Sequence, residues 1–225
     1  MKKMIYLFTL LFTASIILSS CRDNDDNGNG NGTGNNNPGI GSPTATTDPG
    51  VLIGYIDGNP IRWATRNVAA PGTFAQNATN AGMFFQWNRR TGWSSTDPLV
   101  SSPAGATWDN TNATGETWTR TNDPCPIGWR VPTRAELDEL QGAIGEWEVR
   151  SGVNGRIFGS GVNTLFLPAA GHRSTTGSLW SVGAQGCYWG STAWGESGGW
   201  GLWFGRSNSS VYGRAGGFSV RCVSE

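Results

Sequence analysis

Residues 186–223 read GCYWGSTAWGESGGWGLWFGRSNSSVYGRAGGFSVRCV, and this stretch decides the fold class of the 225-residue chain. It places four of the chain's twelve Trp among Gly, Ser and Asn. A stretch that served only as core would contain more Val, Ile and Leu. Rigid aromatics among small polar residues are typical of binding loops. The alternative is that the Gly and Trp residues only form short twisted strands and tight turns.

The end of this stretch alternates between apolar and polar residues, which predicts a half-buried strand over residues 217–223. Residues 201–205 predict a second strand, and the polar run 206–210 predicts a turn between the two. We therefore expect a hairpin that presents loops. Its inward side chains would be Phe218, Val220 and Cys222, and its outward side chains Ser219 and Arg221.

Upstream, the pattern predicts more strands than helices, and the fold class is α+β. Residues 51–56, a tight turn at Asp57-Gly58 and residues 60–64 predict a hairpin. Residues 83–87 are predicted to form a buried apolar run, and residues 166–171 a strand that ends in a turn.

Thr133 and Glu136 predict a capping box at the start of a short helix that Gly142 ends. A second, weaker helix is predicted over residues 144–149. Four carboxylates are predicted to be solvated helical charges: Glu136, Glu139, Glu146 and Glu148.

The N-terminus predicts a lipid-anchored protein. Lys2 and Lys3 precede an apolar run that is too short to span a bilayer comfortably, and small residues then lead to Cys21. Residues 1–20 resemble a bacterial lipoprotein signal, so we expect Cys21 to carry lipid such as palmitate. The acidic residues that follow resemble an export signal of Bacteroidetes lipoproteins. Localisation would then be the outer membrane, facing the cell exterior.

The residues after Cys21 predict a tether and one domain. Residues 21–49 are rich in Asn, Gly, Thr, Ser and Pro, and such a segment cannot bury enough apolar surface to fold. Residues 50–225 are long enough for a single domain with a core. The chain's two Lys lie in the signal, and its charge balances near zero, so no nucleic-acid partner is expected.

Three cysteines remain beyond the lipidated one, which leaves one thiol over if a single disulfide forms. No CxxC pattern is present and His172 is the only His, so no metal and no cofactor are expected. We expect no catalytic residues. His172 is interpreted as structural, and Cys187 has no His close in sequence to activate it.

Several motifs together resemble one family. Four of them are DPCPIGWRVPT at 123–133, LPAAGHR at 167–173, YWGSTA at 188–193 and FSVRCV at 218–223. Together with WATRNV at 63–68 and GMFFQW at 82–87, they resemble the Fibrobacter succinogenes major paralogous domain family over residues 50–225. The resemblance implies a C-type-lectin-like fold of short antiparallel strands, one or two short helices and long Gly- and Trp-rich loops. Members are exported proteins, and most lack an assigned activity.

The resemblance also implies a disulfide between Cys125 and Cys222, with Cys187 as the odd thiol. Closing such a loop would stabilise the fold by a few kcal/mol. The sequence departs from the family at His172, where Tyr is usual, and at Gly190, where Ser is usual. The calcium-binding Glu-Pro-Asn and Trp-Asn-Asp ligand motifs of lectins are absent, and the Trp108-Asp109-Asn110 run is only superficially similar.

Some proteins of that fold are diversified by a retroelement, and this chain is hypothesised to be such a variable protein. Adenine replacement cannot turn an Asn codon into a Trp codon, so Trp194 and Trp200 fit the mechanism poorly. Cys187 and Gly190 are also expected to be exposed and adaptable. The predicted ligand-binding residues are Trp194, Glu196, Trp200, Leu202, Arg206 and Arg214.

The function hypothesis is a surface adhesion module that binds an extracellular protein or carbohydrate through Trp faces. The alternative is a structural or tip subunit of a surface appendage, whose terminal strands would pair with other subunits. An enzyme would need a reactive Cys187 or a pocket around His172, and no nucleophile or metalloprotease motif is present.

Overall fold

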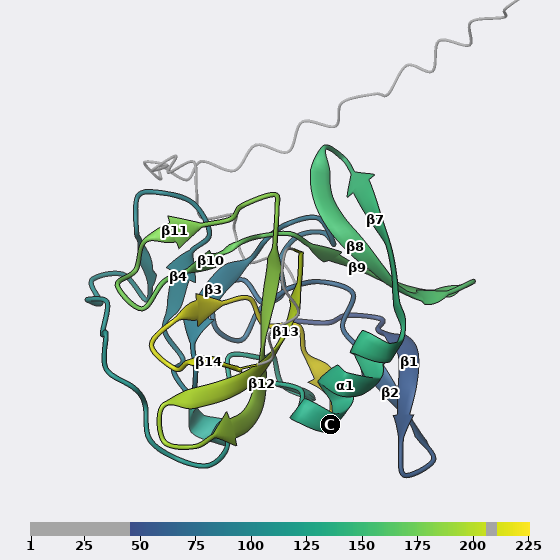
Figure 1. Cartoon of the computed structure of the whole chain (residues 1–225), viewed down its shortest axis with the longest axis horizontal. Helices are drawn as coiled ribbons and strands as arrows, with labels where there is room; N and C mark the ends of the chain where they lie inside the picture. Colours follow the sequence, from purple (N-terminus) through teal and green to yellow (C-terminus); the bar gives the residue numbers. More distant parts are fainter. Residues whose placement is uncertain (1–45, 206–210) are drawn as a thin grey trace, which may run out of the picture. The chain divides into compact units, whose positions relative to one another are not determined.

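The computed structural model describes residues 46–205 and 211–225, which belong to one compact unit. It consists mostly of short antiparallel strands, with one α-helix among the described residues (Figure 1). The predicted α+β class is therefore confirmed. No helix in the described part of the chain has the length and apolar character needed to cross a membrane.

One sheet joins the two ends of the described chain, in the order β1-β2-β16-β6. Its hairpin forms as predicted, and Asp57 and Gly58 adopt the positive φ angles that such a turn requires. The last strand lies between β2 and β6, so strand partners cover both of its edges. The bounds are Val51–Ile56 (β1), Asn59–Trp63 (β2), Val223–Ser224 (β16) and Trp129–Arg130 (β6).

The second sheet has the order β11-β10-β15-β3-β4-β5. All four residues of β3 are buried, as the apolar run predicts. The bounds are Leu179–Trp180 (β11), His172–Arg173 (β10), Gly217–Phe218 (β15), Met83–Gln86 (β3), Gly92–Ser94 (β4) and Ser101–Ser102 (β5).

The third sheet has the order β12-β13-β14, with bounds Gly186–Trp194, Gly198–Phe204 and Val211–Gly213. The predicted hairpin between residues 201–205 and 217–223 is wrong. Residues 201–204 belong to β13 and pair with β12, whereas β15 pairs with β10 and β3. Ser219 and Arg221 are buried rather than outward-facing, because this segment is covered on both sides. The alternation in sequence therefore reflects two covered faces, an apolar one and one that contains Ser219 and Arg221.

The fourth sheet has the order β7-β8-β9, with bounds Ile144–Arg150, Val153–Ser160 and Asn163–Pro168. The strand predicted at 166–171 is present as the end of β9. The second helix predicted over 144–149 is wrong, since these residues form β7 and pair with β8. Glu146 and Glu148 therefore lie on a strand. Their alternation with Trp147 and Val149 is a period of two, which favours a strand.

The helix α1 spans Arg134–Gly142, and the capping box between Thr133 and Glu136 forms as predicted. A short 3-10 helix, η1, spans Arg120–Asn122. The prediction that Glu136 is solvated is wrong, because it is buried and pairs with Arg130 at 2.6 Å. The helix packs against β1, β12 and β13, which lie beside it in Figure 1.

Cys125 and Cys222 form a disulfide in the structure, 97 residues apart in sequence. The bond joins the segment before α1 to the segment before β16. It lies in an aromatic core cluster that includes Trp87, Trp129 and Trp189. A second cluster packs α1 against the hairpin β1–β2 and the sheet β7–β9. The aromatic content noted in the sequence is thus largely interior.

A buried guanidinium connects the C-terminal segment to the rest of the domain. Arg221 donates to Asn67 Oδ1 at 2.9 Å and to the carbonyls of Ala64 and Phe166. Burial lowers the pKa of Arg221 to about 10, so it remains charged at neutral pH. Asp48, near the start of the folded body, lies close enough to Arg221 to interact with its charge.

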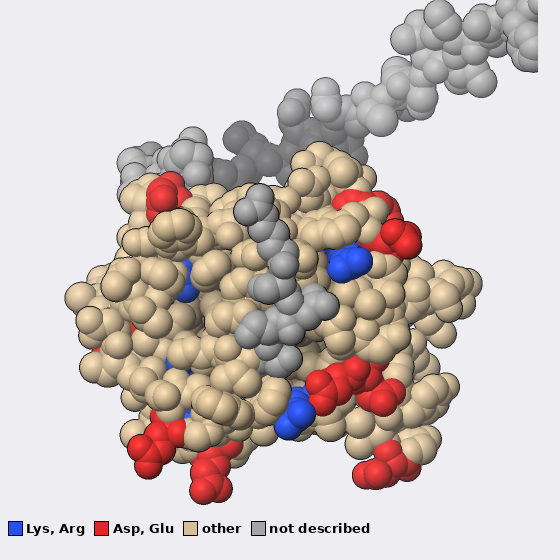
Figure 2. Space-filling model, viewed as in Figure 1, with Lys and Arg blue, Asp and Glu red and all other residues tan. Residues whose placement is uncertain are grey.

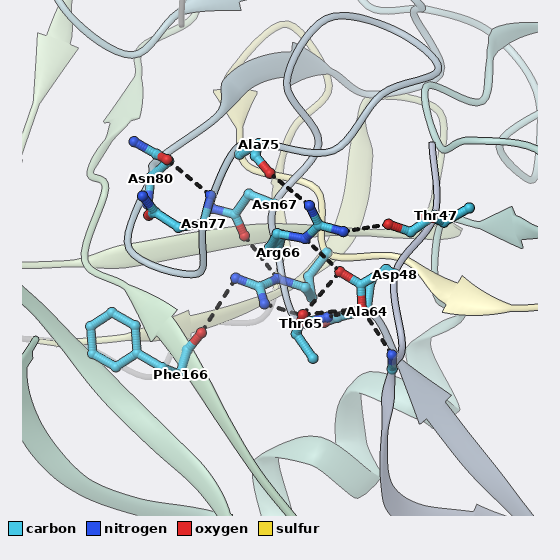
Figure 3. A network of polar contacts seen from close by, with 12 residues as sticks. Thr47, Asp48, Ala64, Thr65, Arg66, Asn67, Ala75, Asn77, Asn80 and Phe166 are labelled. Atoms are coloured by element: carbon cyan, nitrogen blue, oxygen red, sulfur yellow. Dashed lines mark hydrogen bonds and ion pairs between the residues drawn. The ribbon is translucent and has the colours of Figure 1, made fainter. Parts of the chain in front are cut away.

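The folded body starts before the predicted boundary at residue 50. Asp48 accepts hydrogen bonds from the backbone and hydroxyl of Thr65 and from Arg66 Nε (Figure 3). Its side chain has 0% exposure. Asp48 therefore belongs to the domain, although the composition of residues 21–49 predicts that it lies in the tether.

Candidate functional site

The six predicted ligand-binding residues differ widely in exposure. Trp194 is 53% exposed and Glu196 is also exposed, both at the tip between β12 and β13. Trp200 is half-buried. Leu202 and Arg214 are buried, at 4% and 1%. Arg206 lies outside the described residues, as does Cys21, the predicted lipidation site.

The expectation that Cys187, Gly190, Leu202 and Arg214 are exposed is wrong. The helix α1 covers the middle of the β12–β13 hairpin, and Leu202 and Leu137 belong to the same core cluster. A Cβ on Gly190 would lie 2.8 Å from Leu137 Cδ1, so the glycine allows this approach. Diversifying these positions would alter the core rather than a binding surface.

Strand pairing places Trp194 and Trp200, two of the predicted site residues, on one side of the sheet. Trp194 pairs with Gly198, and residues two apart in a strand share a face, so Gly198 and Trp200 point the same way. Val211 of β14 lies opposite Trp200. We call Trp194, Gly198, Trp200 and Val211 the outer face. Exposure rises along it from Leu202, under α1, through Trp200 to Trp194.

The opposite side of the same sheet faces the core. A Cβ on Gly199 would lie 2.5 Å from the Trp87 ring, so only glycine permits this contact. Trp203 stacks on Tyr212 with ring centroids 4.3 Å apart and is 8% exposed. The two faces have opposite characters, which explains why some Trp residues of this stretch are core and others are not.

Trp200 is partly covered by a cation. The guanidinium carbon of Arg134 lies 3.6 Å from the Trp200 ring centroid, and Arg134 also pairs with Asp138 at 3.4 Å. The Arg134 backbone N–H donates to Thr192 Oγ1 at 3.0 Å, which fixes the start of α1 beside β12. Trp194 is therefore the more accessible indole of the outer face.

Arg214 holds the tip of the hairpin in place. Its guanidinium donates to the carbonyls of Gly195, Gly198 and Ala113, at 2.6, 3.0 and 2.7 Å. It also lies over the Trp87 ring at 4.1 Å. Three carbonyls from two segments are thus fixed by one buried side chain. The tip that carries Trp194 is preorganised, which lowers the entropic cost of binding.

An open hollow adjoins this tip, and Arg214 forms part of its lining. Glu116 and Glu196 also line it, and neither forms an ion pair with a residue in 46–205 or 211–225. Acidic side chains lie mainly toward the rim of the face seen in Figure 2, and uncharged residues make up most of its area. The outer face is thus largely apolar, with Arg134 over Trp200 and Glu196 at the adjoining tip.

The structure brings His172 and Cys187 together, although 15 residues separate them in sequence. Cys187 Sγ lies 3.8 Å from His172 Nδ1. Burial raises the pKa of the Cys187 thiol well above its usual value and lowers the pKa of His172. Both shifts favour the neutral forms, so this contact is a thiol beside an imidazole rather than an activated thiolate.

Two further exposed indoles were missed by the sequence reasoning. Trp147 on β7 is 42% exposed and Trp180 on β11 is 58% exposed. Trp147 follows the alternation of β7 and could have been found from that period, whereas no local signal marks Trp180. They serve as reference positions outside the outer face.

No group of three or more His, Cys, Asp or Glu side chains in the described parts of the chain is arranged to hold a metal ion. Comparison with known proteins gives no match to a protein-family model, to a curated protein or to a solved structure. The site is therefore interpreted from its own geometry.

Proposed function

We propose that this chain is a surface lipoprotein whose domain binds an extracellular ligand through the outer face of the β12–β14 sheet. In this proposal Cys21 carries the lipid, and the residues up to about 47 separate the domain from the outer membrane. The domain would be C-type-lectin-like and would belong to the major paralogous domain family that its motifs resemble. The disulfide between Cys125 and Cys222 supports this assignment, because the resemblance implies that pairing.

The observation that carries the proposal is an exposed indole on a fixed hairpin tip. Trp194 is 53% exposed, while Arg214 binds the carbonyls of the glycines on either side of the tip. Trp is enriched among residues that dominate binding energy, and its ring stacks on sugar rings and on apolar groups of proteins. A rigid Trp loses little entropy when it binds.

The ligand would be an extracellular protein or a carbohydrate. The outer face offers apolar area from Trp194 and Val211 and an acidic edge from Glu196. The cations described near this face are Arg134, which lies over Trp200, and the buried Arg214, which binds backbone carbonyls. These two described residues form no exposed basic cluster, which disfavours polyanions such as nucleic acids.

The alternative, a subunit of a surface appendage, finds less support. That function requires a terminal strand whose edge can pair with another subunit. Of the two terminal strands that the structure describes, β16 already lies between β2 and β6, which leaves β1 at the sheet edge for such pairing. The binding function is therefore preferred.

Binding of the full chain to an array of glycans and extracellular proteins tests the proposal. We expect wild type to bind at least one ligand, and we expect Trp194→Ala to weaken that binding by about thirty-fold. That factor corresponds to the roughly 2 kcal/mol typical of a dominant interface residue.

The matched controls are Trp147→Ala and Trp180→Ala, which remove an exposed indole elsewhere. Both should bind as wild type, and all three variants should melt within a few degrees of wild type. Binding that survives Trp194→Ala but is lost in either control would place the site elsewhere. Self-assembly without ligand binding would favour the appendage subunit.

A further inference from the structure

A small cleft of about 130 Å³ lies away from the third sheet, between the loop after β2 and the end of β4. Much of its wall consists of methyl-sized side chains. Ala69, Ala70, Ala75 and Ala81 line it, together with Met83. A cavity of about 150 Å³ is large enough to hold one six-membered ring. This cleft therefore fits one small chemical group.

Backbone hydrogen bonds build the walls of the cleft. The Ala69 N–H donates to Thr73 O at 2.9 Å, and the Ala75 N–H donates to Asn67 O at 2.8 Å. Gly82 has a φ of +70°, and a Cβ there would lie 2.1 Å from Val68 O. The walls are thus fixed before a ligand arrives, as in most small-molecule sites.

The polar groups at the cleft are neutral. Gln76 and Asn80 contribute side-chain amides and Ser95 contributes a hydroxyl, and none of the residues that line the cleft carries a charge. The backbone N–H groups of Ala81 and Gly82 donate to no residue in 46–205 or 211–225. They are available to a carbonyl oxygen of a ligand.

We propose that this cleft binds the acetamido group of a neutral N-acetylated sugar. The acetyl methyl would pack on the alanines, and the acetyl carbonyl would accept from the N–H groups of Ala81 and Gly82. The acetamido N–H would donate to a side-chain oxygen of Gln76 or Ser95. These are the contacts that an amide carrying one methyl group requires.

Other small groups fit the cleft less well. A hydroxyl in place of the acetamido group is shorter and carries no methyl group, so it would leave the alanine methyls of the cleft without an apolar contact. A charged group would find no countercharge, which makes its burial more costly still. The cleft therefore distinguishes an N-acetylated sugar from its parent sugar and from its free amine.

Titration of the ¹⁵N-labelled full chain with N-acetylglucosamine tests the proposal. We expect the amide resonances of Ala81 and Gly82 to shift and to saturate below about 50 mM, since single sugars bind with millimolar constants or weaker. Glucose and glucosamine should shift these resonances at least ten times less at equal concentration.

Two leucine variants locate the binding. Ala70→Leu fills the cleft and should abolish the shifts, whereas Ala78→Leu, in the same loop but outside the lining, should retain them. Should Ala70→Leu fail to fold, Gln76→Ala changes an exposed side chain and should weaken binding several-fold. Trp194→Ala should have no effect, because this inference does not depend on the outer face.

Three results would overturn the proposal. The first is the absence of any shift at Ala81 and Gly82, and the second is an equal response to glucose. The third is binding of N-acetylglucosamine that the cleft variant leaves unchanged.

Discussion

Single residues with unexpected burial organise this domain. Arg173, Arg214 and Arg221 are each 1% exposed, and each binds backbone carbonyls of distant segments. The alternation rule places Arg221 toward solvent, because the rule assumes that one face of a strand is wet. It cannot show that a neighbouring loop supplies carbonyls instead. Burial of these charged residues could therefore not be predicted from local sequence.

At this scale we predict that Arg214→Lys loosens the hairpin tip. A lysine keeps the charge but cannot reach three carbonyls, and each lost hydrogen bond costs about 1 kcal/mol. Amide hydrogen exchange at residues 195–198 should accelerate at least tenfold beyond any change elsewhere, and ligand binding through Trp194 should weaken. Exchange that rises uniformly over the domain would mean that Arg214 has only a general structural role.

The control for this variant is Arg173→Lys. Arg173 binds the carbonyls of Ser94, Thr96 and Gly177, which lie far from the tip in sequence. The Arg173→Lys substitution should loosen the segments around residues 94–96 and 177 and leave amide hydrogen exchange at residues 195–198 as in wild type. An equal response of the tip to both variants would contradict a local role for Arg214.

At the scale of elements, short-range signals predicted the structure well, whereas the predicted pairing of the two C-terminal runs was wrong. The capping box of α1 and the turn at Asp57-Gly58 depend on residues within four positions, and both are present. The prediction of a second helix was wrong because residues 144–149 contain no capping residue, and their polar and apolar side chains alternate with the period of two that is typical of a strand. The C-terminal hairpin failed because two adjacent runs were assumed to pair with each other, whereas each pairs with a strand elsewhere.

The cap of α1 also predicts a pH dependence. Burial by itself would raise the pKa of Glu136, but hydrogen bonds from Arg130 and Thr133 outweigh it, and the pKa is lowered from 4.5. The stabilising contribution of Glu136 is therefore complete above about pH 4.5 and is lost as the pH falls through the folded-state pKa. Chemical denaturation between pH 5 and 3 should show a smaller loss of unfolding free energy for Glu136→Gln than for wild type.

The difference in slope should stay below about 1.4 kcal/mol per pH unit, the limit for one proton. Arg130→Met removes the main partner and should reduce the acid dependence in the same direction. Identical slopes for wild type and Glu136→Gln would contradict the assigned ion pair.

At the scale of the whole molecule, sequence reasoning predicted the α+β class and the pairing of Cys125 with Cys222, the latter only through the family resemblance. It placed the candidate site in the β12–β13 hairpin but could not separate the two faces of that hairpin. Trp194 and Trp203 lie on opposite faces of one sheet, so Trp194 is exposed whereas Trp203 packs on Tyr212 and Phe218 in the core. Which face is covered depends on segments that are far apart in the chain.

The most direct test of the central claim is fluorine NMR of the full chain labelled with 5-fluorotryptophan, during titration with a ligand identified on the array. Single Trp→Phe variants assign the resonances of Trp147, Trp180 and Trp194. We predict that the ligand shifts the Trp194 resonance and leaves those of Trp147 and Trp180 unchanged. A shift at Trp147 or Trp180 with no change at Trp194 would contradict binding through the outer face.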